Sequence, residues 1–183
     1  MEITLITSNP FKAEQLGQHL NAPVLHQKVD LAEIQSLDLQ EIVEHKARSA
    51  YELVKKPVLV EDTALTFKAL GKLPGPLIKW FLTELDNPGL TRLLDGYPDR
   101  SATAEVLFGL CDGPRVQFFA GSMEGEIATK PRGKGGFGWD PIFIPQGCQK
   151  TWGEMDAEEQ KATSMRRIAL KKLEVYLQSH DRS

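Results

Sequence analysis

Two adjacent carboxylates, Glu61 and Asp62, directly follow the apolar run at residues 58–60. Such a run is typical of a short buried strand, and we expect the strand to end where the carboxylates begin. In open α/β sheets, ligands collect beyond the carboxyl ends of the strands, where carboxylate oxygens suit Mg²⁺ or the activation of a water molecule. A helix-capping Asp beside a solvated Glu would give the same pattern, so both interpretations stay open.

Cations and hydrogen-bonding side chains stand at two predicted helix starts. Thr7, Asn9 and Lys12 surround the first start, and Lys161 and Arg166 lie at the last one. A helix N-terminus presents unpaired N–H groups and the positive end of the helix dipole, which together favour phosphate. An ordinary Asn cap with solvated surface cations would explain the same residues without a ligand.

The segment at residues 133–141 is rich in glycine and carries side chains suited to a flat ligand. Phe137 and Trp139 offer stacking faces, and the Asp140 carboxylate can accept hydrogen bonds from ring N–H groups. A hairpin loop with core aromatics is the alternative. Lys79 begins another predicted helix, where it either serves an anion or is solvated. Together these motifs indicate a phosphate-bearing ligand with a metal and a flat base, although no GxxxxGK[ST] loop occurs.

The elements that must position these residues alternate between strand and helix. We expect strands at residues 3–7, 57–60, 103–111, 115–121 and 124–128, and helices at 11–20, 39–53, 77–94 and 163–178, the third of them interrupted at 87–89. The second helix has an apolar stripe that includes Ile42, Val43, Ala47 and Ala50. This order predicts an α/β protein. It would be one domain spanning residues 1–183 with two lobes, a twisted mixed β-sheet flanked by helices and a central cleft.

Charge and cysteine content exclude several classes of protein. The 183-residue chain has a formal net charge of −3, which argues against coating nucleic acid through a basic face. Cys111 and Cys148 form neither a disulfide framework nor a zinc pattern. No apolar run approaches the roughly 20 residues of a membrane span, and no basic region precedes the N-terminal apolar run. We therefore expect a cytoplasmic protein that binds a small molecule, with no nucleic-acid or membrane partner.

In their order along the chain, these blocks resemble the inosine triphosphate pyrophosphatase family, the Ham1-like nucleotidases that remove non-standard purine nucleotides. The resemblance spans nearly the whole chain and rests on Thr7-x-Asn9-x-x-Lys12, Val60-Glu61-Asp62-Thr63, Leu73-Pro74-Gly75-Pro76, Gly136-Phe137-Gly138-Trp139-Asp140-Pro141 and Thr151-x-x-Glu154-Met155. It implies an elongated α/β fold with two lobes, a homodimer and a Mg²⁺ cofactor. It also implies hydrolysis of inosine, deoxyinosine or xanthosine triphosphate to the monophosphate and pyrophosphate.

Carried over by position, the resemblance assigns a role to each motif residue. The triphosphate would be held by Thr7, Asn9, Lys12, Lys46 and Lys161. The catalytic group would be Asp62, as base or metal-linked carboxylate, with Glu61 and Lys12 beside it, and the metal would be held by Glu33 and Asp62. Phe137 would stack on the base, and the base edge would be shaped or read by Trp139, Asp140 and Arg166.

The sequence departs from the family pattern Lys-Asn-x-x-Ser-His-Arg, because Met165 replaces the histidine. A methionine sulfur is only a weak acceptor, so a donor to the purine is missing. We expect a reduced preference for inosine over adenosine triphosphate, which Met165→His would widen again. Met165 filling a gap in the core is the alternative. A catalytically weak nucleotide-binding or regulatory protein, and a pyrophosphatase with altered base specificity, are the competing hypotheses.

Overall fold

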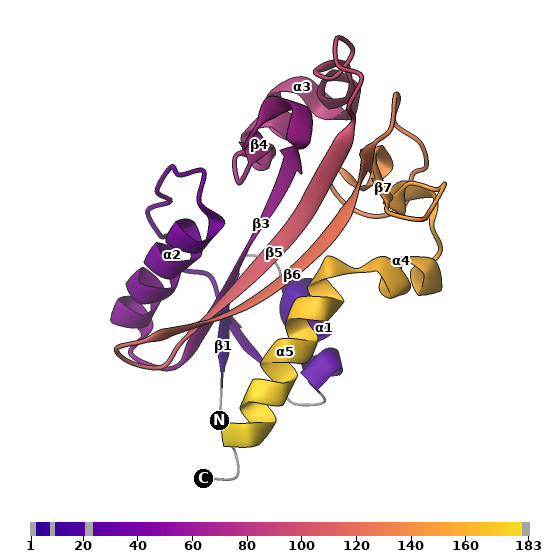
Figure 1. Cartoon of the computed structure of the whole chain (residues 1–183). Helices are drawn as coiled ribbons and strands as arrows, with labels where there is room; N and C mark the ends of the chain where they lie inside the picture. The colour runs from indigo at the N-terminus through magenta and orange to yellow at the C-terminus, as the bar shows by residue number, and fades with distance from the viewer. Residues whose placement is uncertain (1–2, 8–9, 21–23, 181–183) are drawn as a thin grey trace. The chain divides into compact units, whose positions relative to one another are not determined.

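The strands of the chain form one mixed sheet of seven. The computed structural model describes residues 3–7, 10–20 and 24–180. Its strands lie in the order β2-β1-β3-β5-β6-β7, with β4 paired to β3 (Figure 1). Strand β1 pairs in parallel with β2 and β3, whereas β4 and β7 pair antiparallel with β3 and β6. The predicted α/β class with a mixed sheet and flanking helices is confirmed.

Strands and helices alternate along the first part of the chain, and strands dominate its middle. The strands are β1 (Thr4–Ile6), β2 (Leu25–Gln27), β3 (Val58–Phe67), β4 (Pro74–Gly75), β5 (Ser101–Cys111), β6 (Val116–Ile127) and β7 (Phe143–Pro145). The α-helices are α1 (Pro10–Leu20), α2 (Leu39–Val54), α3 (Ile78–Arg92), α4 (Ala157–Thr163) and α5 (Met165–His180). Single 3₁₀ turns occur at η1 (Lys68–Leu70), η2 (Asp140–Ile142) and η3 (Trp152–Glu154).

The chain divides into two compact units, which are described separately. Unit 1 contains Met1–Asp62, Val106–Gly121 and Arg166–Ser183, and unit 2 contains Thr63–Glu105 and Ser122–Met165. The long strands β3, β5 and β6 each contribute one part to unit 1 and the other part to unit 2.

In unit 1, helix α2 covers one face of the sheet. Its Val43, Ala47 and Ala50 pack in a buried cluster with Val58 and Val60 of β3. The local sequence sets the helix bounds. At the start, the Asp38 side chain accepts hydrogen bonds from the backbone N–H groups of Gln40 and Glu41. At the end, Lys55 adopts a left-handed conformation with a φ of 56°. The predicted helix and its apolar stripe are confirmed.

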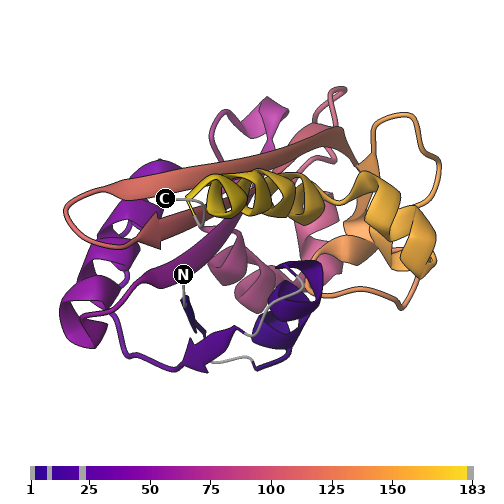
Figure 2. The ribbon, with the colours of Figure 1, turned by 90° about the horizontal axis from the view of Figure 1, so that it is seen from below.

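Helix α5 lies against the opposite face of β5 and β6 in unit 1, as both ribbon views show (Figures 1 and 2). The rings of Tyr176 and Phe119 meet edge to face with their centroids 5.3 Å apart, and Lys172 Nζ donates to the Ala120 carbonyl at 2.6 Å. Because successive side chains of a strand point to opposite faces, Phe118 packs with the α2 cluster while its neighbour Phe119 faces α5. The sheet of unit 1 therefore has a helix on each face.

Unit 2 is built around the aromatic cluster of Trp139, Phe143 and Trp152. The ring centroids of Phe143 and Trp152 are 4.6 Å apart, and those of Trp139 and Trp152 are 5.6 Å apart. Helix α3 breaks at Asp86, whose φ of 53° is not helical, just before Pro88. The predicted interruption of this helix is confirmed, and the break begins one residue earlier than expected.

Two expectations about strands are wrong. Strand β3 does not end at Glu61 but continues to Phe67, because residues 63–67 are again apolar and β-branched and pair with β4. The segment at 124–128 is not a separate strand but the second half of β6. The predicted last helix at 163–178 is confirmed as α5. The short helix α4 before it was not predicted, and Ser164, with an extended ψ of 114°, separates the two.

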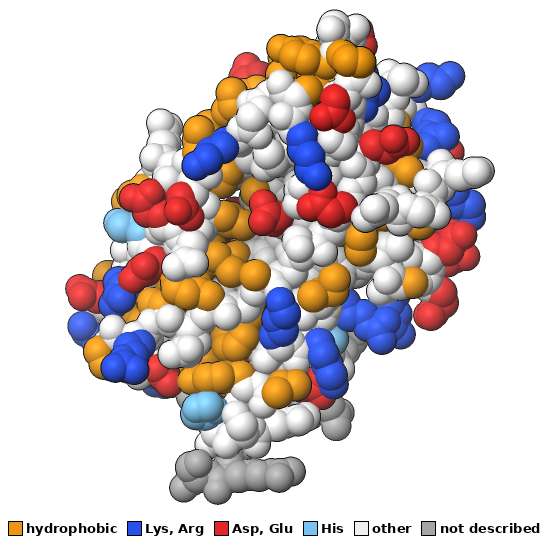
Figure 3. Space-filling view, viewed as in Figure 1, with side chains coloured by type: hydrophobic (Ala, Val, Ile, Leu, Met, Phe, Trp, Pro, Cys, Tyr) orange, Lys and Arg blue, Asp and Glu red, His pale blue; other side chains and the backbone are white. Residues whose placement is uncertain are grey.

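Two features concern the expectation of no nucleic-acid or membrane partner: the distribution of surface charge and the apolar character of the helices. Figure 3 shows acidic and basic side chains interspersed on the viewed face, not one continuous basic area. Among the residues that the structure describes, no helix is both long enough and apolar enough to cross a membrane.

Candidate active site

The two adjacent carboxylates lie in the middle of β3 and face opposite sides of the sheet. Val58 and Val60 pack toward α2, and strand alternation puts Asp62 on the same side. Glu61 instead points to the other face, toward α1 and α5, where its ion-pair partners lie. Lys46 of α2 and the cations of α1 and α5 therefore contact different carboxylates. The two carboxylates therefore do not face a common ligand site.

Glu61 is a buried carboxylate held between two cations. Its side chain is 5% exposed, with Oε1 lying 2.6 Å from Lys12 Nζ and Oε2 accepting from Arg166 Nη1. Burial by itself would raise the pKa of Glu61, but the charges and hydrogen bonds of Arg166 and Lys12 outweigh it and hold that pKa below its usual value. Glu61 is therefore ionised at neutral pH and poorly suited to take up a proton.

Asp62 is more accessible and contacts a different lysine. Its side chain is 29% exposed, and Oδ2 lies 3.3 Å from Lys46 Nζ. The same Nζ donates to the Glu61 carbonyl at 3.2 Å, which ties α2 to the middle of β3. A partly exposed carboxylate beside an ammonium group can accept a proton from water or bind a hard cation next to a phosphate.

The remaining residues predicted for unit 1 have different placements. Thr7 follows β1, and its backbone N–H donates to the Gln27 carbonyl at 3.1 Å. Asn9 lies outside the described residues. Glu33 is exposed in the segment between β2 and α2. Within the described part of the chain, no group of three or more His, Cys, Asp or Glu side chains is placed to hold a metal ion.

Unit 2 contains the predicted base-stacking residue on a tightly folded loop. The Phe137 side chain is 87% exposed, and its backbone N–H donates to Asp140 Oδ2 at 2.6 Å. Gly136 has a φ of 77° and lies so close to Asp140 that a Cβ there would overlap the carboxylate. Asp140 thus holds the loop that presents Phe137. Trp139 is buried in the aromatic cluster, as the core interpretation of this loop expects.

We expect Asp140→Asn to leave the loop intact and the free energy of unfolding at pH 7 unchanged or higher. Burial raises the pKa of Asp140, and the Phe137 N–H offsets only part of that rise. The group therefore contributes stability below a pH of about 4 that is lost as the pH rises through its folded pKa. An Asn oxygen keeps the acceptor without the buried charge.

Asp140→Ala is the matched control, because it removes the acceptor and should cost about 0.5–1.5 kcal/mol. Urea unfolding at pH 4 and pH 7, with hydrogen exchange of the Phe137 amide, measures both effects. Equal losses of stability in the Asn and Ala variants at pH 7 would contradict the expectation.

Lys161 lies on α4 in unit 2 and is solvated. Its side chain is 57% exposed, with Nζ 4.0 Å from a Glu158 oxygen. In the family pattern Lys-Asn-x-x-Ser-His-Arg the lysine precedes the serine by four positions, but Lys161 precedes Ser164 by three. Gln160 occupies the fourth position, and its Nε2 donates to the Trp152 carbonyl at 2.7 Å. Lys161 is thus an exposed cation, and its role in binding phosphate stays a prediction.

Met165 and Arg166 differ in their environments although they are neighbours. Met165 is 9% exposed, which agrees with the interpretation as a core residue. Arg166 contacts Glu61, and its guanidinium carbon lies 5.2 Å from the centre of the Phe108 ring. Arg166 Nη2 is buried and has no hydrogen-bond partner among the described residues. The local sequence gave no signal for the pairing of Arg166 with Glu61.

We expect Met165→His to lower stability and to leave base selectivity unchanged. A buried imidazole in place of an apolar side chain should cost about 1–3 kcal/mol when its ring nitrogens find no partner. Urea unfolding gives the first quantity, and the ratio of kcat/KM for inosine over adenosine triphosphate gives the second. A histidine variant of unchanged stability with a higher ratio would restore the interpretation of Met165 as a lost donor.

Two basic residues outside the assigned site, Arg132 and Lys79, contact groups of the protein itself. Arg132 Nη2 donates to the Gln149 carbonyl at 2.8 Å, and its Nε lies 3.4 Å from a Glu154 oxygen. Lys79 Nζ lies 5.6 Å from the centre of the Trp80 ring.

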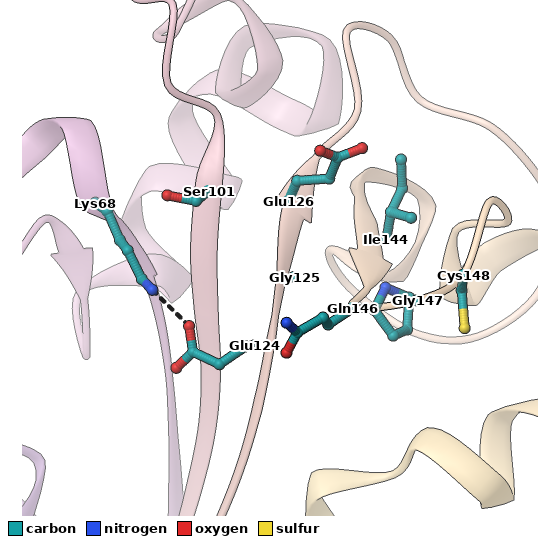
Figure 4. Close-up of a pocket in the computed structure, with 10 residues that line it drawn as sticks. Lys68, Ser101, Glu124, Gly125, Glu126, Ile144, Gln146, Gly147 and Cys148 are labelled. Atoms are coloured by element: carbon teal, nitrogen blue, oxygen red, sulfur yellow. Dashed lines mark hydrogen bonds and ion pairs between the residues drawn. The ribbon is translucent and has the colours of Figure 1, made fainter.

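A separate hollow of about 340 Å³ lies on unit 2 (Figure 4). Lys68 and Glu124 line it and pair with each other at 2.6 Å, and Thr103 also donates to Glu124 at 3.0 Å. Ser101, Gln146 and Cys148 complete much of its polar lining. None of the predicted site residues lies here.

Comparison with known proteins places the whole chain among one group of relatives. The model of the Ham1 family matches residues 3–176. Inosine triphosphate pyrophosphatase 2 of Trypanosoma cruzi is 45% identical over 179 residues, which cover 96% of this chain and 91% of the relative. The inosine triphosphate pyrophosphatase of Yarrowia lipolytica is 43% identical over 183 residues, covering 97% and 96%. The solved structure of a HAM1 protein from Coxiella burnetii has a TM-score of 0.89 at 31% identity, covering 98% of this chain and 99% of that one.

Proposed function

The chain belongs to the Ham1 family, and from this premise we propose that it is a nucleoside triphosphate pyrophosphatase acting on non-standard purine nucleotides. Inosine, deoxyinosine and xanthosine triphosphates would be hydrolysed to the monophosphate and pyrophosphate. The proposal treats residues 1–183 as one catalytic domain. It also includes a homodimer and a cytoplasmic role in clearing damaged nucleotides, as the resemblance implies.

One observation in unit 1 favours hydrolysis over a purely nucleotide-binding role. The middle of β3 carries a partly exposed carboxylate, Asp62, beside Lys46 at 3.3 Å. On the other face of the same strand, Lys12 and Arg166 converge on Glu61. A carboxylate that can accept a proton, with one lysine beside it and two further cations gathered on the other face of the same strand, suits hydrolysis of a triphosphate better than simple storage of a nucleotide.

In the proposed reaction, a water molecule attacks the α-phosphorus and the bond between that phosphorus and the bridging oxygen breaks. Asp62 accepts the proton of the water, and pyrophosphate leaves with the bridging oxygen. Lys12 and Lys46, with Thr7, Asn9 and Lys161, would bind the phosphates and offset the charge that develops on their oxygens. Phe137 would stack on the base. Arg166 Nη2, a buried donor, and Asp140 would read the base edge, with Trp139 shaping it.

The donor set is compatible with Mg²⁺ as the cofactor. Asp62 and Glu33 offer hard carboxylate oxygens, and no larger acidic cluster occurs within the described ranges. Mg²⁺ in nucleotide enzymes usually takes one or two protein carboxylates and completes its shell with phosphate oxygens and water. A small protein donor set therefore agrees with a cation that binds together with the triphosphate. When bound, the Mg²⁺ ion would neutralise part of the negative charge of the phosphates.

Pyrophosphate release from a panel of triphosphates tests the proposed function. With Mg²⁺ present, we expect kcat/KM for inosine, deoxyinosine and xanthosine triphosphates to exceed that for adenosine triphosphate by at least about tenfold. Binding of these nucleotides without turnover would support the regulatory alternative. Fast release from another triphosphate would instead support altered base specificity. Light scattering after gel filtration tests the homodimer.

A further inference from the structure

Glu61 already uses both of its carboxylate oxygens. Oε1 contacts Lys12 Nζ at 2.6 Å, and Oε2 accepts from Arg166 Nη1. Lys12 belongs to α1 and Arg166 to α5, so a single carboxylate from β3 joins two helices whose contacting residues are far apart in the sequence. With 5% of the side chain exposed, little of this carboxylate is open to a metal ion or a water molecule.

We propose that Glu61 is a positioning residue, which fixes the ammonium group of Lys12 and the guanidinium group of Arg166 in one arrangement and neither binds the metal nor takes up the proton. This inference rests on the proposed function and deepens it. It divides the two adjacent acids of β3 between two tasks, with the chemistry assigned to Asp62 alone.

The geometry of β3 supports this division. Successive residues of a strand point to opposite faces, so Glu61 and Asp62 cannot both turn toward one ion while the strand stays paired. The partners differ accordingly, with Lys12 and Arg166 on one acid and Lys46 on the other. Arg166 is held further by the Phe108 ring at 5.2 Å. Its position therefore depends on both β3 and β5.

Charge explains why the two cations need Glu61. The ammonium group of Lys12 and the guanidinium group of Arg166 contact the two oxygens of one carboxylate, so they lie close together and repel each other. The buried anion between them offsets this repulsion. Without it, Lys12 and Arg166 would separate toward solvent. The nucleotide would then have to order two mobile side chains, Lys12 at its phosphates and Arg166 at its base, which weakens binding. The chemical step at Asp62 would be little affected, because Asp62 faces away from Glu61.

Glu61→Gln tests the inference, with Asp62→Asn as the comparison. We expect KM for inosine triphosphate to rise roughly tenfold in Glu61→Gln, as for the loss of one charge-assisted interaction. Its kcat should stay within about threefold of the wild-type value, and the Mg²⁺ concentration for half-maximal rate should not change. Asp62→Asn should show the reverse pattern, a large loss of kcat. Glu61→Asp keeps the charge on a shorter side chain, so its KM should rise less than that of the Gln variant.

Three outcomes would overturn the inference. These are a loss of kcat in Glu61→Gln as large as in Asp62→Asn, a shift of the Mg²⁺ midpoint, and a KM that is unchanged or lower. If Glu61→Gln does not fold, the same measurements on Glu61→Asp decide.

If the wild type releases no pyrophosphate from any triphosphate, the proposed function fails, and positioning is then read from inorganic tripolyphosphate. We expect tripolyphosphate to raise the Tm of the wild type more than the Tm of Glu61→Gln. Equal shifts would refute the positioning role.

Discussion

Asp62→Asn is expected to lower kcat by about 10²- to 10⁴-fold, the range of a lost general base. The amide has the shape of the carboxylate but can neither accept a proton from water nor supply negative charge to a cation. Asp62 is partly exposed and contacts Lys46 at 3.3 Å, so its replacement should change stability by no more than about 1 kcal/mol. Pyrophosphate release at saturating substrate and Mg²⁺ measures the rate, and urea unfolding measures the stability.

Glu124→Gln provides the matched control. Glu124 lies on β6 and pairs with Lys68 at 2.6 Å, so it is also a strand carboxylate beside a lysine, but none of the predicted site residues lies near that pair in the unit 2 hollow. Its amide variant should keep the wild-type kcat. Near-normal turnover in Asp62→Asn would refute the role of Asp62, and a large loss in Glu124→Gln would show that the assay responds to removal of any such carboxylate.

Reversing the charge at Lys12 is expected to destabilise the protein far more than reversing it at Lys161. Lys12→Glu places a second carboxylate against buried Glu61, which now lies 2.6 Å from the Lys12 ammonium. Removing one partner of a buried ion pair typically costs 3–5 kcal/mol. Because Arg166 remains in place and Lys12 is partly exposed, we expect a loss of about 2–4 kcal/mol. Lys161→Glu should cost no more than about 0.5 kcal/mol.

Urea unfolding of the two variants measures this difference, and KM for inosine triphosphate measures their part in binding. The sequence left open whether Lys12 and Lys161 are solvated surface cations. In the structure Lys12 pairs with buried Glu61, whereas the Lys161 side chain is 57% exposed. If Lys12→Glu were as stable as Lys161→Glu, the ion pair with Glu61 would contribute nothing to folding. If both lysines bind the triphosphate, KM for inosine triphosphate should rise in both variants.

The sequence by itself determined the class of fold, the main helices and the residues on which the family resemblance rests. Helix α2 could be predicted nearly to the residue, since the spacing of Ile42, Val43, Ala47 and Ala50 repeats with the helical period. Such signals are local, and short-range geometry decides them. The break in α3 near Pro88 could be predicted for the same reason.

Only the tertiary structure shows which side chains the acidic residues of β3 contact. The end of β3 could not be placed from the sequence, because charged residues in the middle of a strand read locally as a strand end, and only their distant partners make them tolerable there. Arg166 meets Glu61 across 105 positions, a contact that no spacing rule gives. The burial of Met165 likewise depends on side chains from other elements. Residue types and periodicity are properties of a segment, whereas the partner of a charge and the depth of a side chain are set only when distant segments pack together.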